Sequence, residues 1–122
     1  MKRILVVDDD PDILTLERKI LEKAGYDVAT AMDGRSAVGL ACVADFDLIL
    51  LDVMMPGMDG FEVSRELLDK KGGALPIVFV TARDDSESMR EGFRSGGSVF
   101  LSKPFTATQL IRIVGDMLGN RA

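Results

Sequence analysis

The sequence predicts a doubly wound α/β sandwich, in which helices cover both faces of a five-stranded parallel sheet to give three layers. Short, nearly unbroken apolar runs recur along the chain, and a segment with helical spacing follows each one. Unbroken apolar runs are typical of parallel strands that are covered on both faces. Strict alternation of strands and helices favours this class, and right-handed crossovers make 2-1-3-4-5 the expected strand order.

The first strand and helix have readable boundaries. ILVV (4–7) is the expected strand, Asp10 can cap the helix, and Pro11 suits its first turn. The helix is expected to end at Gly25. Its apolar stripe at helical spacing is expected to consist of Ile13, Leu16, Ile20 and Ala24.

The second and third strand–helix pairs follow the same pattern. YDVATA (26–31) alternates apolar and polar residues as an edge strand would, and Asp33 can open the helix after it. LILL (48–51) is apolar throughout. Asp59 and Glu62 then have the spacing of a capping box, which predicts the start of the third helix.

The last two strands are predicted at IVFV (77–80) and VFL (99–101). A fourth helix is expected over about 85–95, between them. Thr106 and Gln109 fit a second capping box, and this pair predicts the start of the fifth helix.

Composition bounds the function. A chain of 122 residues fits one domain, 1–122, and no apolar run approaches a membrane span. The net charge of −5 argues against direct nucleic-acid binding, and the lack of histidine excludes histidine base chemistry and histidine-ligated zinc. The lone cysteine, Cys42, permits no internal disulfide and is expected to be a small core residue, which suggests a reducing cytoplasm.

Three carboxylates are expected to meet at one edge of the sheet. Asp8 and Asp9 follow the first strand, and Asp52 follows the third. In this topology the two strands are neighbours, and ligands bind beyond their carboxyl ends. Clustered like charges oppose folding unless something offsets them, and a site with oxygen donors only favours Mg²⁺. The alternative for each acid alone is a helix cap or a solvated loop residue.

Two further side chains end strands at the same edge. Thr81 follows IVFV, and Lys103 follows VFLS, with Pro104 next to it on a bond that suits the cis form. A hydroxyl and an ammonium beside a magnesium site suit a phosphoryl group. A carboxylate can act as the nucleophile in phosphoryl transfer, and Asp52 is the best placed because it is central and alone on its strand.

At these residues the sequence resembles the receiver domain of two-component response regulators, a chemotaxis-regulator-like domain of flavodoxin-like fold. The resemblance runs through KRILVVDDDPDI, DLILLDVMMPGMDGFE, LPIVFVTA and FLSKPF, and covers essentially the whole chain. It implies a signalling switch of a phosphorelay that accepts a phosphoryl group from a histidine kinase and then changes the surface formed by the fourth helix, fifth strand and fifth helix.

Carried over by position, the resemblance makes Asp52 the phosphoacceptor. It implies that Asp9 and Asp52 bind Mg²⁺ directly, together with the backbone carbonyl of Met54, and that Asp8 acts largely through water. It also implies that the chain is no enzyme beyond its own phosphorylation and dephosphorylation.

The same resemblance implies that Thr81 and Lys103 contact the phosphoryl group. It places Phe100 at the aromatic switch position, to be read together with Thr81. Met54 and Arg83, two residues past Asp52 and Thr81, are expected to flank the path of the attacking water.

The implied partners are a sensor histidine kinase or a histidine phosphotransfer protein, and a downstream protein or fused output domain. The chain is expected to be a monomer or a phosphorylation-dependent homodimer, away from membranes. It is either a stand-alone regulator or part of a larger protein. Two alternatives stand: a constitutive interaction module that is not phosphorylated, and a nucleotide or flavin binder, which lacks support because no glycine-rich phosphate loop occurs.

Overall fold

A computed structural model describes residues 1–72, 75–82 and 99–119. It contains a five-stranded parallel sheet in the order β2-β1-β3-β4-β5, as expected from the sequence. The strands are β1 (Arg3–Val7), β2 (Asp27–Ala31), β3 (Leu48–Asp52), β4 (Ile77–Thr81) and β5 (Val99–Ser102). The described helices are α1 (Pro11–Lys23), α2 (Gly34–Val43), α3 (Gly60–Lys71) and α5 (Ala107–Leu118). The helix expected over 85–95 lies outside the described residues.

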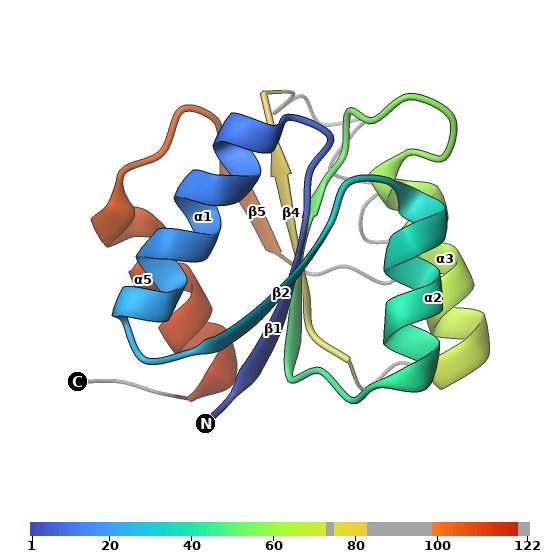
Figure 1. Ribbon diagram of the computed structural model, residues 1–122, viewed down its shortest axis with the longest axis horizontal. Helices are drawn as coiled ribbons and strands as arrows, with labels where there is room; N and C mark the ends of the chain where they lie inside the picture. The colour runs from blue at the N-terminus through green and yellow to red at the C-terminus, as the bar shows by residue number, and fades with distance from the viewer. Residues whose placement is uncertain (73–74, 83–98, 120–122) are drawn as a thin grey trace.

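The helices cover the sheet from both sides. Helices α1 and α5 lie on one face, and α2 and α3 lie on the other (Figure 1). Each interface has its own apolar layer, and the central strands β3 and β4 are buried along their whole length. Burial on both faces explains why these strands are apolar runs without alternation, whereas β2, the edge strand, is mostly half-buried.

The helix starts agree with the expected caps. The Asp10 side chain accepts a hydrogen bond from the Asp12 backbone N–H at 2.9 Å, and Asp33 accepts one from Ser36 at 2.7 Å. Both capping boxes form, at α3 and at α5. These bonds satisfy backbone donors that have no partner within the first turn of a helix.

The buried stripe of α1 differs from the expected one. Leu14, Glu17 and Leu21 face the sheet, whereas Leu16 is half exposed. Both stripes have helical spacing, and the apolar pattern selected the wrong one because a glutamate interrupts the stripe that is buried. The expectation for Cys42 was also wrong: its side chain is exposed, because the buried residues of α2 include its neighbour Ala41.

Strand register brings the predicted site residues together. Val7 of β1 pairs with Leu51 of β3, so Asp8 lies next to Asp52 at the carboxyl edge of the sheet. Thr81, the last residue of β4, pairs with Ser102 of β5, directly before Lys103. Four strands therefore end at one place, and each contributes a polar side chain there.

Candidate phosphorylation site

The acidic residues form one cluster. Carboxylate oxygens of Asp8, Asp9 and Asp52 lie within 4.8 Å of one another. Asp8 and Asp52 are only 1% and 3% exposed, and Asp9 faces solvent. Three oxygen donors at this separation, one of them open to solvent, are a suitable donor set for a hard divalent cation such as Mg²⁺.

Backbone groups hold the two buried carboxylates in place. The Asp10 N–H donates to Asp8 Oδ1 at 2.9 Å, and the Met54 N–H donates to Asp52 Oδ1 at 3.2 Å. The loop after Asp52 is held close to the strand, since the Gly60 N–H donates to the Val53 carbonyl at 3.1 Å. Any Cβ at residue 60 would collide with the Asp52 carbonyl oxygen, so this approach requires glycine.

Lys103 links the cluster to the last strand. Its Nζ lies 3.1 Å from Asp8 Oδ2 and 3.6 Å from Asp52 Oδ1. The Lys103 N–H donates to the Thr81 carbonyl at 2.9 Å, and the peptide bond from Lys103 to Pro104 is cis. The ammonium therefore lies between the two buried carboxylates, where it offsets part of their repulsion.

The charge state of Asp52 reflects this environment. Burial, followed by the nearby Asp8 carboxylate, raises the pKa of Asp52 to about 6, although Lys103 and the Met54 N–H act in the opposite direction. Burial also disfavours the Lys103 ammonium, but the Asp52 and Asp8 carboxylates outweigh it, so the pKa of Lys103 rises above its ordinary value. At neutral pH Asp52 is therefore mainly ionised.

Sequence reasoning missed one acid near this site. Glu17 of α1 is 1% exposed, and burial, together with the field of Asp8, raises its pKa to about 8. Lys103 and Asp52 also act on it electrostatically. Its position three residues after Leu14 and four before Leu21, on one helical face, was the available signal.

Comparison with known proteins identifies the family. A family model described as the response regulator receiver domain matches residues 4–115. The chain belongs to this family. ResD, a transcriptional regulatory protein of Bacillus subtilis, is 40% identical over 116 residues, which are 95% of this chain and 48% of ResD. Response regulator PleD of Caulobacter vibrioides is 46% identical over 117 residues, 94% of this chain and 26% of PleD. The chain thus spans about half or less of these curated relatives.

Solved receiver structures agree in fold. Chemotaxis protein CheY4 of Vibrio cholerae superposes with a TM-score of 0.93 at 36% identity, covering 97% of this chain and 99% of that chain. Response regulator TrrA of Thermotoga maritima, solved in complex with Mg²⁺ and BeF, gives 0.88 at 35% identity, covering 97% and 100%. The predicted family and fold are confirmed. Receiver domains are regulatory domains of two-component signalling, they interact with histidine kinases and output domains, and phosphorylation-dependent switching is their general role.

The aromatic side chain of Phe100 packs against the core. The Phe100 ring lies 5.2 Å from the ring of Phe79 and 6.4 Å from that of Phe61, measured between centroids. Phe100 is half-buried. Arg83 and the rest of the segment from residue 83 to 98 lie outside the described residues.

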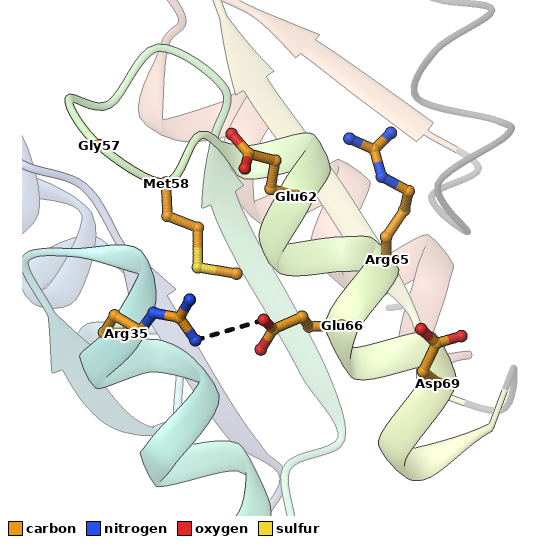
Figure 2. Close-up of a pocket in the computed structure, with 7 residues that line it drawn as sticks. All are labelled: Arg35, Gly57, Met58, Glu62, Arg65, Glu66 and Asp69. Carbon is orange, nitrogen blue, oxygen red and sulfur yellow. Dashed lines mark hydrogen bonds and ion pairs between the residues drawn. The ribbon is translucent and has the colours of Figure 1, made fainter.

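A separate groove lies between α2 and α3. Its volume is about 660 Å³, and Figure 2 shows Arg35 of α2 reaching across it to Glu66 of α3, with 3.3 Å between Nη1 and Oε1. The lining residues are Arg35, Gly57, Met58, Glu62, Arg65, Glu66 and Asp69. None of them belongs to the acidic cluster.

No helix in the described part of the chain is long and apolar enough to cross a membrane.

Proposed function

We propose that residues 1–122 form one receiver domain that acts as a phosphorylation-controlled switch, with Asp52 as the phosphoacceptor. The donor is the phosphohistidine of a sensor kinase or of a histidine phosphotransfer protein. The observation that carries the proposal is the cluster itself: Asp8, Asp9 and Asp52 within 4.8 Å, with the Lys103 ammonium 3.6 Å from Asp52.

In the proposed reaction an Asp52 carboxylate oxygen attacks the phosphorus atom. The new O–P bond forms as the N–P bond to the donor imidazole breaks, and the imidazole leaves with the bonding electron pair. Lys103 moves from the carboxylates to a phosphoryl oxygen, and the Thr81 hydroxyl donates to another. Thr81 ends β4, the neighbour of β3, and Lys103 follows β5 with its Nζ 3.6 Å from Asp52 Oδ1, which supports these roles.

The proposed metal is Mg²⁺, held by Asp8, Asp9, Asp52 and the backbone carbonyl of Met54. When bound, it supplies positive charge that offsets the acids and the incoming phosphoryl group. The oxygen-only donor set of the cluster supports this choice. Without such a cation, three neighbouring carboxylates would repel an anionic phosphodonor.

Phosphorylation is proposed to be read out through Thr81 and Phe100. A bond from the Thr81 hydroxyl to a charged phosphoryl oxygen is worth about 1.5–3 kcal/mol. The Phe100 ring packs against Phe79, which lies two residues before Thr81 on β4, and this proximity along one strand supports a coupling between Thr81 and Phe100. The output is a partner protein or a fused domain in the cytoplasm, reached by a monomer or by a phosphorylation-dependent homodimer.

The proposal is tested by exposing the chain to acetyl phosphate and recording its intact mass. With Mg²⁺ the mass should increase by one phosphoryl group, and without Mg²⁺ the increase should nearly vanish. Asp52→Asn should abolish it, whereas Asp69→Asn, the same change at an exposed site on α3, should not. A wild-type chain that takes up no phosphoryl group with Mg²⁺ present would instead support the constitutive interaction module.

A further inference from the structure

Glu17 is an unusual residue for its place in the fold. It is buried on the same side of α1 as Leu14 and Leu21. Helix α1 covers one face of the sheet together with α5 (Figure 1). The layer around it is apolar, with Leu101, Leu110 and other aliphatic side chains. A leucine at this position would pack without any penalty for burying a polar group.

The carboxyl group of Glu17 is buried and has no hydrogen-bond partner at one oxygen. Its Oε2 is the one buried side-chain oxygen or nitrogen in this condition among the described residues. None of the hydrogen bonds or ion pairs described for the chain involves its side chain. Buried polar groups without partners are rare in native proteins, and each calls for an explanation.

The groups that act on Glu17 are those of the phosphorylation site. They come from three elements: Asp8 after β1, Asp52 on β3, and Lys103 after β5. From α5 the buried neighbours in this layer are the apolar Leu110 and Val114, while Arg112 and Asp116 face solvent. Two other titratable residues lie at the ends of this layer. Asp9 is exposed at the carboxyl ends of the strands, and Tyr26 lies at the opposite end.

We propose that Glu17 is a positioning residue of the phosphorylation site, a buried carboxyl group that acts through space on Lys103 and on the bound cation. In the metal-free site Glu17 keeps its proton, and the Lys103 ammonium remains with Asp8 and Asp52. When a divalent cation binds, the added positive charge favours the ionised form of Glu17, and the proton goes to solvent. Ionised Glu17 then draws Lys103 away from Asp8, which leaves that carboxylate to the cation.

This inference rests on the proposed function, because it takes Asp8, Asp9 and Asp52 as the residues that hold the cation. It adds a carboxyl group from α1 to the three acids of the cluster. Since burial holds the pKa of Glu17 at about 8 and that of Asp52 at about 6, protons released near pH 7 come mainly from Glu17.

The test is a calorimetric titration of the full chain with MgCl₂ at pH 7. Repeating it in two buffers of different ionisation enthalpy gives the number of protons released for each cation bound. The wild type should release more than about half a proton beyond what Glu17→Gln releases. Glu22→Gln is the matched control, because Glu22 is an exposed residue of the same helix, and it should behave as the wild type.

A second measurement compares Mg²⁺ affinity at pH 6 and pH 8.5. From pH 6 to pH 8.5 the wild-type Kd should decrease by a factor about ten times larger than the factor for Glu17→Gln, because ionised Glu17 attracts the cation. Glu17→Leu should show the same small pH dependence as Glu17→Gln and should melt above the wild type without metal. A merely structural glutamate would change the melting temperature but not the proton count.

The outcomes separate this inference from the function on which it rests. If the wild type and Glu17→Gln bind Mg²⁺ with equal proton release and equal pH dependence, Glu17 does not act on the site, and the proposed function stands. If the wild type binds no Mg²⁺ at either pH, both proposals fail.

Discussion

Removing the charge of Asp52 should stabilise the metal-free protein. Its folded-state pKa is about 6 against an ordinary value of 3.8, so the folded state binds a proton more tightly than the unfolded chain does. Stability is therefore lost as pH rises from about 4 to about 6, and the loss persists above that range. A difference of about two pKa units corresponds to roughly 3 kcal/mol.

Asp52→Asn removes this loss of stability, but the substitution also has a cost that offsets part of the gain. The Asn carbonyl can still accept the hydrogen bond of the Met54 N–H, but the ion pair with Lys103, at 3.6 Å, is lost. We therefore expect a net gain of about 1–2 kcal/mol at pH 7.5, or roughly 4–8 °C in melting temperature. The gain should be much smaller at pH 4, where Asp52 is protonated in the folded state and close to half protonated in the unfolded chain.

Thermal unfolding followed by circular dichroism in EDTA, at pH 4 and at pH 7.5, measures both values. Asp69→Asn, on the exposed face of α3, is the matched control and should change neither. A metal-free Asp52→Asn protein that melts below the wild type at pH 7.5 would refute burial and repulsion as the dominant effects at this site.

Three further predictions concern the surroundings of the site. Gly60→Ala should destabilise the protein by more than about 2 kcal/mol, because the added Cβ would collide with the adjoining backbone. Gly39→Ala, which has open space around it in α2, should stabilise the protein by up to about 1 kcal/mol. Urea unfolding curves of the two variants measure both changes. Bulk at Ala82 should slow phosphorylation, while changes at Met54 should mainly alter hydrolysis, and equal effects on both rates would contradict this division. Beryllofluoride should change the packing of Phe100, and an unchanged ring environment in NMR spectra would exclude it as a switch.

The sequence was sufficient for the fold because several local signals agree with one another. Apolar runs without alternation, together with caps at Asp10, Asp33, Asp59 and Thr106, define elements that only a few topologies can connect. The same topology predicted that Asp8 and Asp52 would be neighbours, since residues that end adjacent parallel strands must meet at one edge.

Side-chain burial within a helix was harder to predict. Helix α1 has apolar residues on two adjoining faces, and the face with the unbroken apolar pattern includes the half-exposed Leu16. The buried face contains Glu17, which apolar periodicity assigns to solvent. Cys42 shows the converse error, because an apolar neighbourhood in sequence does not fix the direction of one side chain.

The most direct test of the central claim is the position of the phosphoryl group. Borohydride reduction of an aspartyl phosphate converts that residue to homoserine, and tandem mass spectrometry of the digested, labelled chain then locates it. The account predicts conversion at Asp52 alone, and only when Mg²⁺ was present during labelling. Conversion at Asp8 or Asp9, or none at Asp52 in a chain that carries the label, would contradict it.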